Sequence, residues 1–243
     1  MMSATLKQRL ANGQSVLMVN PNHVSSSLAE KLTRAGADSI FVDCEHGAAG
    51  FEQLQQMAKA ARFGGGYTIV RPQSQDRSTI TRCLNCGVDG VMVPLVHTAE
   101  NAREVVRTIR YACPDDYDEK LIIVMIESTQ AVENLDEILA VEGIDVFFVG
   151  PGDLSQSMGY SPRVAPGARR PQPVVELVDQ TLGRIRRAGK FAGTLVVKED
   201  VAHLVEAGAQ LLYYHADPFV NDGVNVMRCL SASPVTRQSS VAV

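Results

Sequence analysis

Ionisable side chains stand directly after several short apolar runs, at the points where strands are predicted to end. They are Asp43, Glu45, His46, Arg71, Glu127, Asp153, His215 and Asp217. Carboxylates at neighbouring strand ends can bind a divalent cation, an arginine can bind an anionic oxygen, and a histidine can move a proton near neutral pH. Their grouping predicts one site that combines these three kinds of chemistry.

Glu127 and Asp153 are the candidate metal ligands. Glu127 ends the apolar run 121–126, and Asp153 follows the run 146–149 after the turn 150–152. Two carboxylates with water are the usual protein share of a Mg²⁺ or Mn²⁺ site, and they leave positions open for a chelating substrate. In the alternative interpretation, both acids only cap the start of a helix or turn. Because they follow adjacent predicted strands, the metal site is favoured.

Arg71 and His46 are the candidate groups for binding an oxygen and moving a proton. Arg71 ends the run 67–71, so its planar guanidinium can meet a carboxylate or an enolate oxygen. The alternative is a structural ion pair at the rim. His46 stands between Glu45 and Gly47 after another strand end, where it can serve as a general base. The alternative there is a purely structural histidine.

These residues need a scaffold that brings many strand ends together. Apolar runs predict strands at 15–20, 39–43, 67–71, 90–94, 121–126, 146–149, 191–193 and 211–215. Amphipathic patterns predict helices at 25–35, 51–61, 79–85, 99–110, 131–140, 174–188, 199–207 and 220–230. Eight strand–helix units without a break in composition predict a single (β/α)₈ TIM barrel over residues 1–230, with its site at the C-terminal strand ends. Residues 160–173 should form a long loop on that face, and residues 231–243 a flexible tail.

The composition argues against several classes of protein. The formal net charge of the 243 residues is −4, without the basic surplus of a nucleic-acid-binding protein. No apolar run is long enough to span a bilayer, and the N-terminus lacks a secretory signal. Five cysteines without a disulfide-type spacing suit a reducing compartment. We therefore expect a cytoplasmic enzyme with neither a nucleic-acid nor a membrane partner.

Six short motifs, taken together, resemble those of one enzyme family. They lie at residues 41–46, 70–72, 90–94, 126–128, 134–138 and 150–155. They follow one another in family order over most of the chain, from about residue 6 to residue 230. The chain resembles the HpcH/HpaI-type class II aldolases, which are metal-dependent pyruvate aldolases related to macrophomate synthase.

The resemblance implies a role for each central residue. Glu127 and Asp153 would hold Mg²⁺, Mn²⁺ or Co²⁺, and the metal would chelate a pyruvate-like 2-oxo acid. Arg71 would bind the keto oxygen and stabilise the enolate. His46 would serve as the acid and base, and the backbone near Gly152 and Asp153 would receive the substrate carboxylate. The family assembles as hexamers, which implies a homo-oligomer with the last helix on a neighbouring subunit.

Four further residues would surround these groups: Asp43, Glu45, Asn85 and Met125. Glu45 would orient metal-bound water. Relatives usually carry an aspartate at the position of Asn85, which supports the histidine from a neighbouring subunit, so His46 should be a poorer base. Relatives also carry a glutamine at the position of Met125, so this corner of the pocket should be more apolar. They carry a longer loop in place of residues 114–120, and the shorter stretch here implies an altered acceptor or a more open pocket.

The sequence thus predicts a metal-dependent carbon–carbon lyase that cleaves or forms a 4-hydroxy-2-oxo acid through a pyruvate enolate. Two alternatives remain open. The same scaffold can use the enolate for decarboxylation or for a biosynthetic condensation. A relative that has lost turnover can bind a ligand only, and Asn85 is the feature that most favours this alternative.

Overall fold

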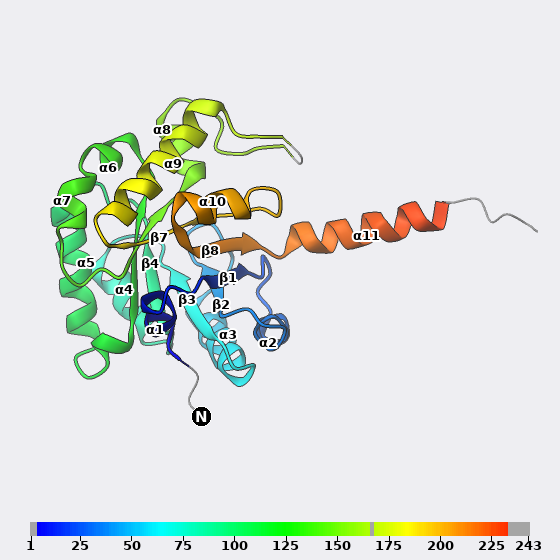
Figure 1. The fold of residues 1–243 in the computed structure, drawn as a ribbon. Coiled ribbons are helices and arrows are strands. Elements are labelled where there is room, and N and C mark those ends of the chain that lie inside the picture. The colour runs from blue at the N-terminus through cyan, green and yellow to red at the C-terminus, as the bar shows by residue number, and fades with distance from the viewer. Residues whose placement is uncertain (1–3, 166–167, 233–243) are drawn as a thin grey trace, which may run out of the picture.

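In the computed structural model, eight parallel strands form a closed barrel in sequence order (Figure 1). The structure describes residues 4–165 and 168–232. The strands are β1 (Val16–Asn20), β2 (Ser39–Asp43), β3 (Tyr67–Arg71), β4 (Gly90–Val93), β5 (Leu121–Ile126), β6 (Val146–Val149), β7 (Phe191–Leu195) and β8 (Ala209–His215). The predicted (β/α)₈ barrel is confirmed, and each strand lies within two residues of its expected bounds at either end.

Helices connect the strands and cover the outside of the barrel (Figure 1). They are α1 (Leu6–Ala11), α2 (Ser26–Arg34), α3 (Phe51–Phe63), α4 (Arg77–Leu84), α5 (Ala99–Ala112), α6 (Thr129–Glu133), α7 (Leu135–Leu139), α8 (Pro151–Ser157), α9 (Gln172–Arg187), α10 (Val201–Ala207) and α11 (Asp217–Ala232), with a 3₁₀ helix at Tyr117–Glu119. The single helix expected at 131–140 is divided at Asn134, whose side-chain amide donates to the carbonyl of His97 at 2.9 Å. The sequence did not indicate α1 or α8, because six or seven residues are too few to show a helical period.

The hydrophobic core has two layers, one inside the barrel and one between the barrel and its helices. Side chains alternate between the two faces along a strand, so every second residue points inward. The inward residues include Met18, Phe41, Ile69, Met125 and Tyr213. Two positions further along each of these strands stand Asn20, Asp43, Arg71, Glu127 and His215, which this alternation places in the mouth of the barrel. The buried residues Leu6 and Leu10 of α1 belong to the inner layer and close the opposite end.

The last helix, α11, leaves the barrel instead of covering it (Figure 1). Its apolar side chains are exposed, with Phe219 at 52%, Met227 at 67% and Leu230 at 65%. At its base lies an apolar groove of about 460 Å³, whose lining includes Leu17, Val19, Leu32, Val196, Val201 and Tyr214. This groove follows the junction of β8 and β1, where a helix after the eighth strand would pack in a closed (β/α)₈ barrel.

The remaining predictions concern the loop and the tail. Between α8 and α9, the described residues 158–165 and 168–171 lie outside regular helices, as expected for the long loop, although residues 172 and 173 already belong to α9. Residues 231 and 232 extend α11, and the rest of the expected tail, 233–243, lies outside the described residues. In the part of the chain that the structure describes, no helix is both long and apolar enough to cross a membrane.

Candidate active site

Arg71 lies in the barrel mouth between two carboxylates. Its Nε and Nη2 atoms donate to the two oxygens of Asp43 at 2.9 and 2.6 Å, and Nη1 lies 3.0 Å from Glu45 Oε2. Burial alone would raise the pKa of Asp43, but the hydrogen bonds and charge of Arg71 outweigh burial and lower that pKa. Arg71 is therefore a cation fixed by ionised Asp43, and N–H groups on Nη1 and Nη2 remain available for a third partner.

Asp43 also orders the turn that carries Glu45 and His46. Its Oδ1 atom accepts the backbone N–H groups of Glu45 at 3.0 Å and of His46 at 3.2 Å. A side chain at Gly47 would collide with the carbonyl oxygen of Asp43, so this tight turn requires glycine. The His46 ring is 65% exposed, and its Nε2 atom lies 3.8 Å from Glu45 Oε2. His46 is thus positioned by the turn and accessible from the mouth.

Glu127 is a buried carboxylate with one oxygen paired and one unpaired. It is 3% exposed, and its Oε1 atom accepts the backbone N–H of Leu95 at 2.7 Å. Leu95 has a left-handed backbone with φ 59°, an unfavourable conformation for leucine that aims this N–H at Glu127. The Oε2 atom is buried and has no hydrogen-bond partner in the described part of the chain. Burial, together with the nearby charge of Asp153, raises the pKa of Glu127 to about 8.

Asp153 stands in the first turn of α8, directly after β6. β5 and β6 are paired neighbours, with Ile126 opposite Val149, so the residues that follow them lie close together. The charge of Asp153 contributes to the raised pKa of both Glu127 and Glu45, as expected for acids that share one barrel mouth. Pro151 is the first residue of α8, and a first helical turn leaves the backbone N–H groups of the next residues, Gly152 and Asp153, without partners in the helix.

The two carboxylates fit a divalent cation. Glu127 Oε2 is the decisive atom, because a buried carboxylate oxygen without a partner is unfavourable and a cation would compensate it. Across the described residues, 4–165 and 168–232, no cluster of three or more His, Cys, Asp and Glu side chains has a metal-binding arrangement. Two protein carboxylates would therefore share such an ion with water or substrate oxygens, which is common for Mg²⁺.

The comparison with known proteins identifies the family. Residues 14–232 match the family model described as HpcH/HpaI aldolase/citrate lyase. The chain belongs to this family. A 2-keto-3-deoxy-L-rhamnonate aldolase from Klebsiella pneumoniae subsp. pneumoniae is 33% identical over 225 residues, which cover 83% of this chain and 82% of the relative. Aldolases are carbon–carbon lyases, so the expected enzyme class is confirmed.

Solved structures of HpcH/HpaI-like proteins share the architecture. The citrate synthase SbnG superimposes with a TM-score of 0.83 at 26% identity, over 93% of this chain and 97% of that chain. Macrophomate synthase gives a TM-score of 0.79 at 21% identity, over 93% and 90% of the two chains, which shows a common fold. The expected relation to macrophomate synthase is therefore confirmed at the level of the fold.

Two residues of this HpcH/HpaI family member lie outside the group in the mouth. Asn85 is exposed at the C-terminal end of α4, on the outer layer of the barrel. Asn85 leads into the first residues of β4 and so lies toward the end of the barrel opposite the mouth, and no hydrogen bond connects it to His46 within residues 4–165 and 168–232. Met125 is buried in the inner core, one inward position before Glu127, and makes the floor beneath this carboxylate apolar.

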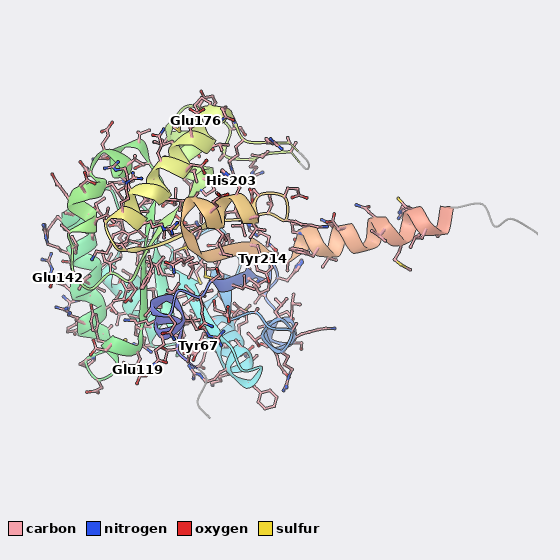
Figure 2. All side chains as sticks on the ribbon, in the orientation of Figure 1. Tyr67, Glu119, Glu142, Glu176, His203 and Tyr214 are labelled. Atoms are coloured by element: carbon pink, nitrogen blue, oxygen red, sulfur yellow. The ribbon has the colours of Figure 1, made fainter. Side chains whose placement is uncertain are left out.

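The expectation that the short stretch 114–120 opens the pocket is wrong within one chain. This stretch connects the C-terminal end of α5 to the first residue of β5, so it lies at the N-terminal end of the barrel. Glu119 and Lys120 line a small cavity there together with Tyr67, the first residue of β3 (Figure 2). Arg71 and Glu127 follow the opposite ends of the same strands, so the loop cannot shape the pocket around them.

Sequence reasoning gave no role to three polar residues beside the site and noted His215 only by its position. Asn20, Asn22, Tyr213 and His215 form a hydrogen-bonded group at the C-terminal ends of β1 and β8. The signal that could have found Asn20 and Tyr213 is the two-residue alternation, since both occupy inward positions of their strands. Asn22 gives no such signal, because it lies beyond the strand.

Proposed function

We propose that the chain is a divalent-metal-dependent carbon–carbon lyase that cleaves or forms a 4-hydroxy-2-oxo acid through a pyruvate enolate. One observation carries this proposal. The buried, unpaired oxygen of Glu127 and the carboxylate of Asp153 follow two paired strands, in the same barrel mouth as the fixed cation of Arg71. A cation site next to a positioned guanidinium suits a substrate with adjacent carboxylate and keto oxygens.

Glu127 and Asp153 would hold the ion, for which Mg²⁺, Mn²⁺ and Co²⁺ are the candidates. When bound, it would withdraw electron density from the 2-oxo acid and so favour the enolate. Arg71 would bind the 2-oxo oxygen, where negative charge develops during cleavage. Because Asp43 and Glu45 already hold Arg71, its N–H groups need little reorganisation when that charge appears.

The other residues of the mouth bind the carboxylate and move the proton. The backbone N–H groups of Gly152 and Asp153, in the first turn of α8, would receive the substrate carboxylate. His46, oriented near Glu45, would take the proton from the C4 hydroxyl as the C3–C4 bond breaks. An asparagine at position 85 of a neighbouring subunit could orient His46 but could not stabilise its protonated form by charge.

The relatives suggest the substrate class and the assay. A 2-keto-3-deoxy acid with a C4 hydroxyl is a 4-hydroxy-2-oxo acid, and relatives at 32–33% identity are named 2-keto-3-deoxy-L-rhamnonate aldolase. Purified protein should release pyruvate from at least one such acid in the presence of Mg²⁺, Mn²⁺ or Co²⁺, measured by coupling to lactate dehydrogenase. Absence of pyruvate release with every combination of acid and metal would overturn the proposal.

A biosynthetic condensation is the second candidate, because the chain resembles the citrate synthase SbnG at 26% identity over nearly its whole length. Incubation of oxaloacetate or pyruvate with candidate acceptors separates the possibilities. A new carbon–carbon product without cleavage activity would favour condensation, and carbon dioxide release alone would favour decarboxylation. Pyruvate binding without any product would indicate a relative that only binds its ligand.

We also propose that the chain forms a homo-oligomer in which α11 of one copy covers the apolar groove of another. Val220, Val224 and Met227 have helical spacing along one exposed side of α11. The groove beside β1 and β8 is apolar and lacks the helix that would normally follow the eighth strand. A neighbouring α11 would cover both apolar surfaces. All five cysteines are free, which supports a cytoplasmic location for this assembly.

A further inference from the structure

Four polar residues form a network at the ends of β1 and β8, in a part of the mouth that the carboxylate pair does not occupy. Asn20 and His215 end the paired strands β1 and β8 and stand opposite each other in register. Tyr213 lies one inward position before His215, and Asn22 follows β1. In the closed barrel, β1 lies across from β5, which Glu127 follows, and β7 alone separates β8 from β6, which precedes Asp153. The proposed mechanism assigns no task to this network.

Backbone donors determine how both asparagine side chains are oriented. The N–H of Asn22 donates to Asn20 Oδ1 at 2.8 Å, so the amide nitrogen of Asn20 is the atom that donates to Tyr213 Oη at 2.9 Å. The N–H of Asp217 donates to Asn22 Oδ1 at 3.1 Å, so Asn22 Nδ2 faces His215 Nδ1 at 2.8 Å. Asn22 makes both contacts from a left-handed backbone, φ 63°, which asparagine tolerates better than most residues.

This orientation selects one tautomer of His215. Because Asn22 Nδ2 is a donor, His215 Nδ1 must accept, and the ring proton of the neutral imidazole must be on Nε2. The Nε2 atom lies 3.4 Å from Tyr213 Oη, so its N–H points toward the phenol oxygen. Burial lowers the pKa of His215, which favours this neutral form.

The hydroxyl proton of Tyr213 is left without an acceptor. Its oxygen faces two donors, the amide of Asn20 and the imidazole N–H of His215, and no acceptor for the O–H exists among residues 4–165 and 168–232. The ring is held edge-on by Phe41 and Phe148, at centroid distances of 4.9 and 6.0 Å. Burial raises the pKa of Tyr213 to about 12, so the phenol keeps its proton at neutral pH.

The free O–H lies beside the place where the substrate would bind. Tyr213 Oη contacts Asn20 and His215, which stand in the mouth, and its ring packs against Phe41, whose ring centroid is 6.0 Å from Arg71 Cζ. The proposed 2-oxo acid half occupies the space between Arg71 and the pair Glu127 and Asp153. The remaining wall of the barrel toward β8 and β1 is then available for the second half of the substrate, which carries the C4 oxygen.

Building on the proposed function, we propose that Tyr213 is a catalytic residue whose hydroxyl donates a hydrogen bond to the C4 oxygen of the substrate. In cleavage, the C4 hydroxyl loses its proton to His46, and negative charge develops on the oxygen that Tyr213 contacts. The C3–C4 electron pair then moves to the pyruvate half to form the enolate, and the C4 oxygen becomes the carbonyl of the released aldehyde. Asn20, Asn22 and His215 are positioning residues that keep the phenol proton directed at this oxygen.

The experiment compares two reactions of the metal-loaded enzyme. Exchange of the pyruvate methyl protons with deuterium oxide, followed by NMR, requires the enolate but no C4 oxygen. Cleavage of a 4-hydroxy-2-oxo acid requires both the enolate and the C4 oxygen. Tyr213→Phe removes only the hydroxyl, and Tyr67→Phe is the matched control, because Tyr67 starts β3 at the end of the barrel opposite the mouth (Figure 2). Asn22→Gly removes the amide but retains a residue that suits the left-handed backbone.

Tyr213→Phe should lower kcat for cleavage about 100-fold and change exchange less than about threefold, as for the loss of one donor to a developing oxyanion. Asn22→Gly should lower kcat for cleavage about tenfold and likewise leave exchange nearly unchanged, and Tyr67→Phe should change neither reaction. Unchanged cleavage in Tyr213→Phe, or equal loss of cleavage and exchange, would overturn the role of Tyr213. Absence of both reactions in the wild-type enzyme would instead contradict the proposed function.

Discussion

At the scale of single residues, the site depends on how each charge is held. Arg71 donates to Asp43 through two nitrogens and lies 3.0 Å from Glu45, so its guanidinium has one orientation. The sequence predicted that Arg71, Asp43 and Glu127 stand at strand ends, since apolar runs are visible in it. The two hydrogen bonds from Arg71 to Asp43 were not predictable, because they depend on side-chain rotamers. The hydrogen bond from the Leu95 N–H to Glu127 was not predictable either, because it depends on a left-handed backbone.

Arg71→Lys tests whether the planar geometry of the Arg71 guanidinium matters, because it replaces two parallel hydrogen bonds with a single ammonium group. Lysine keeps the charge but cannot bind Asp43 with two parallel hydrogen bonds while donating to a substrate oxygen. We expect kcat/KM for cleavage to fall about 100- to 1,000-fold, with the melting temperature little changed. Arg62→Lys is the control, since Arg62 pairs with Asp89 at 3.0 Å on the outer surface. Similar activity in the two variants would mean that Arg71 only contributes charge.

The raised pKa of Glu127 predicts a pH-dependent stability of the metal-free protein. Burial shifts this pKa from 4.5 to about 8, so between these values the folded protein holds a proton that the unfolded chain releases. Stability therefore falls as the pH rises through this window. In EDTA, Glu127→Gln should raise the melting temperature by about 3–8 °C at pH 8.5 and by much less at pH 5.

The control for this effect is Glu142→Gln. Glu142 is exposed on the surface, so its replacement should leave the melting temperature unchanged at both pH values. If Glu127→Gln shifts the melting temperature equally at pH 5 and pH 8.5, the carboxylate of Glu127 does not titrate in this window. The inference that burial disfavours the charged form of Glu127 would then be wrong.

At the scale of elements, the strands were predictable and the short helices were not. The strands are continuous apolar runs because barrel interior and helices cover both of their faces. α8 has only seven residues, yet it places Asp153 next to Glu127. The sequence therefore predicted that the two acids follow adjacent strands, but not that one of them stands on a helix. The short loop 114–120 was misjudged because its end of the barrel was not considered.

The junction between β6 and α8 gives a direct test of this arrangement. A Cβ atom on Gly150 would lie 2.9 Å from Glu127 Cβ and 3.0 Å from Glu127 Oε2, so Gly150→Ala must displace the carboxylate. We expect Mn²⁺ affinity to fall at least about tenfold, together with a lower melting temperature. Gly152→Ala, whose Cβ would meet only Pro162 O at 3.7 Å, should retain the melting temperature. Normal Mn²⁺ affinity in Gly150→Ala would contradict the geometry of Glu127.

At the scale of the whole molecule, the barrel is complete as a sheet but not as a layer of helices. α11 extends from the barrel with an apolar side exposed, and the groove at β8 and β1 is uncovered (Figure 1). The sequence predicted a helix at 220–230 from its periodicity. The periodicity alone could not predict its direction, because the same amphipathic pattern suits packing on its own barrel or on another, whereas the family resemblance implied packing on a neighbouring subunit.

Charges on the apolar side of α11 should dissociate the assembly. Wild-type protein should have a mass of several times the 26.3 kDa monomer in light scattering after size-exclusion chromatography. The double variant Met227→Glu and Leu230→Glu should elute with a smaller mass, because buried unpaired charges oppose association. Asn225→Glu adds a charge to the same helix at a polar position and should leave the mass unchanged. A monomeric wild type would exclude the proposed exchange of α11.

The most direct test of the account concerns the carboxylate pair itself. Calorimetric titration of the EDTA-treated wild type with Mn²⁺ should show one site per chain. Glu127→Gln and Asp153→Asn should each lower the affinity at least about 100-fold, because each removes one of two charged ligands. The control Glu142→Gln should bind as the wild type does. Unchanged Mn²⁺ affinity in both ligand variants would contradict the account, since Glu127 and Asp153 would then not hold the metal.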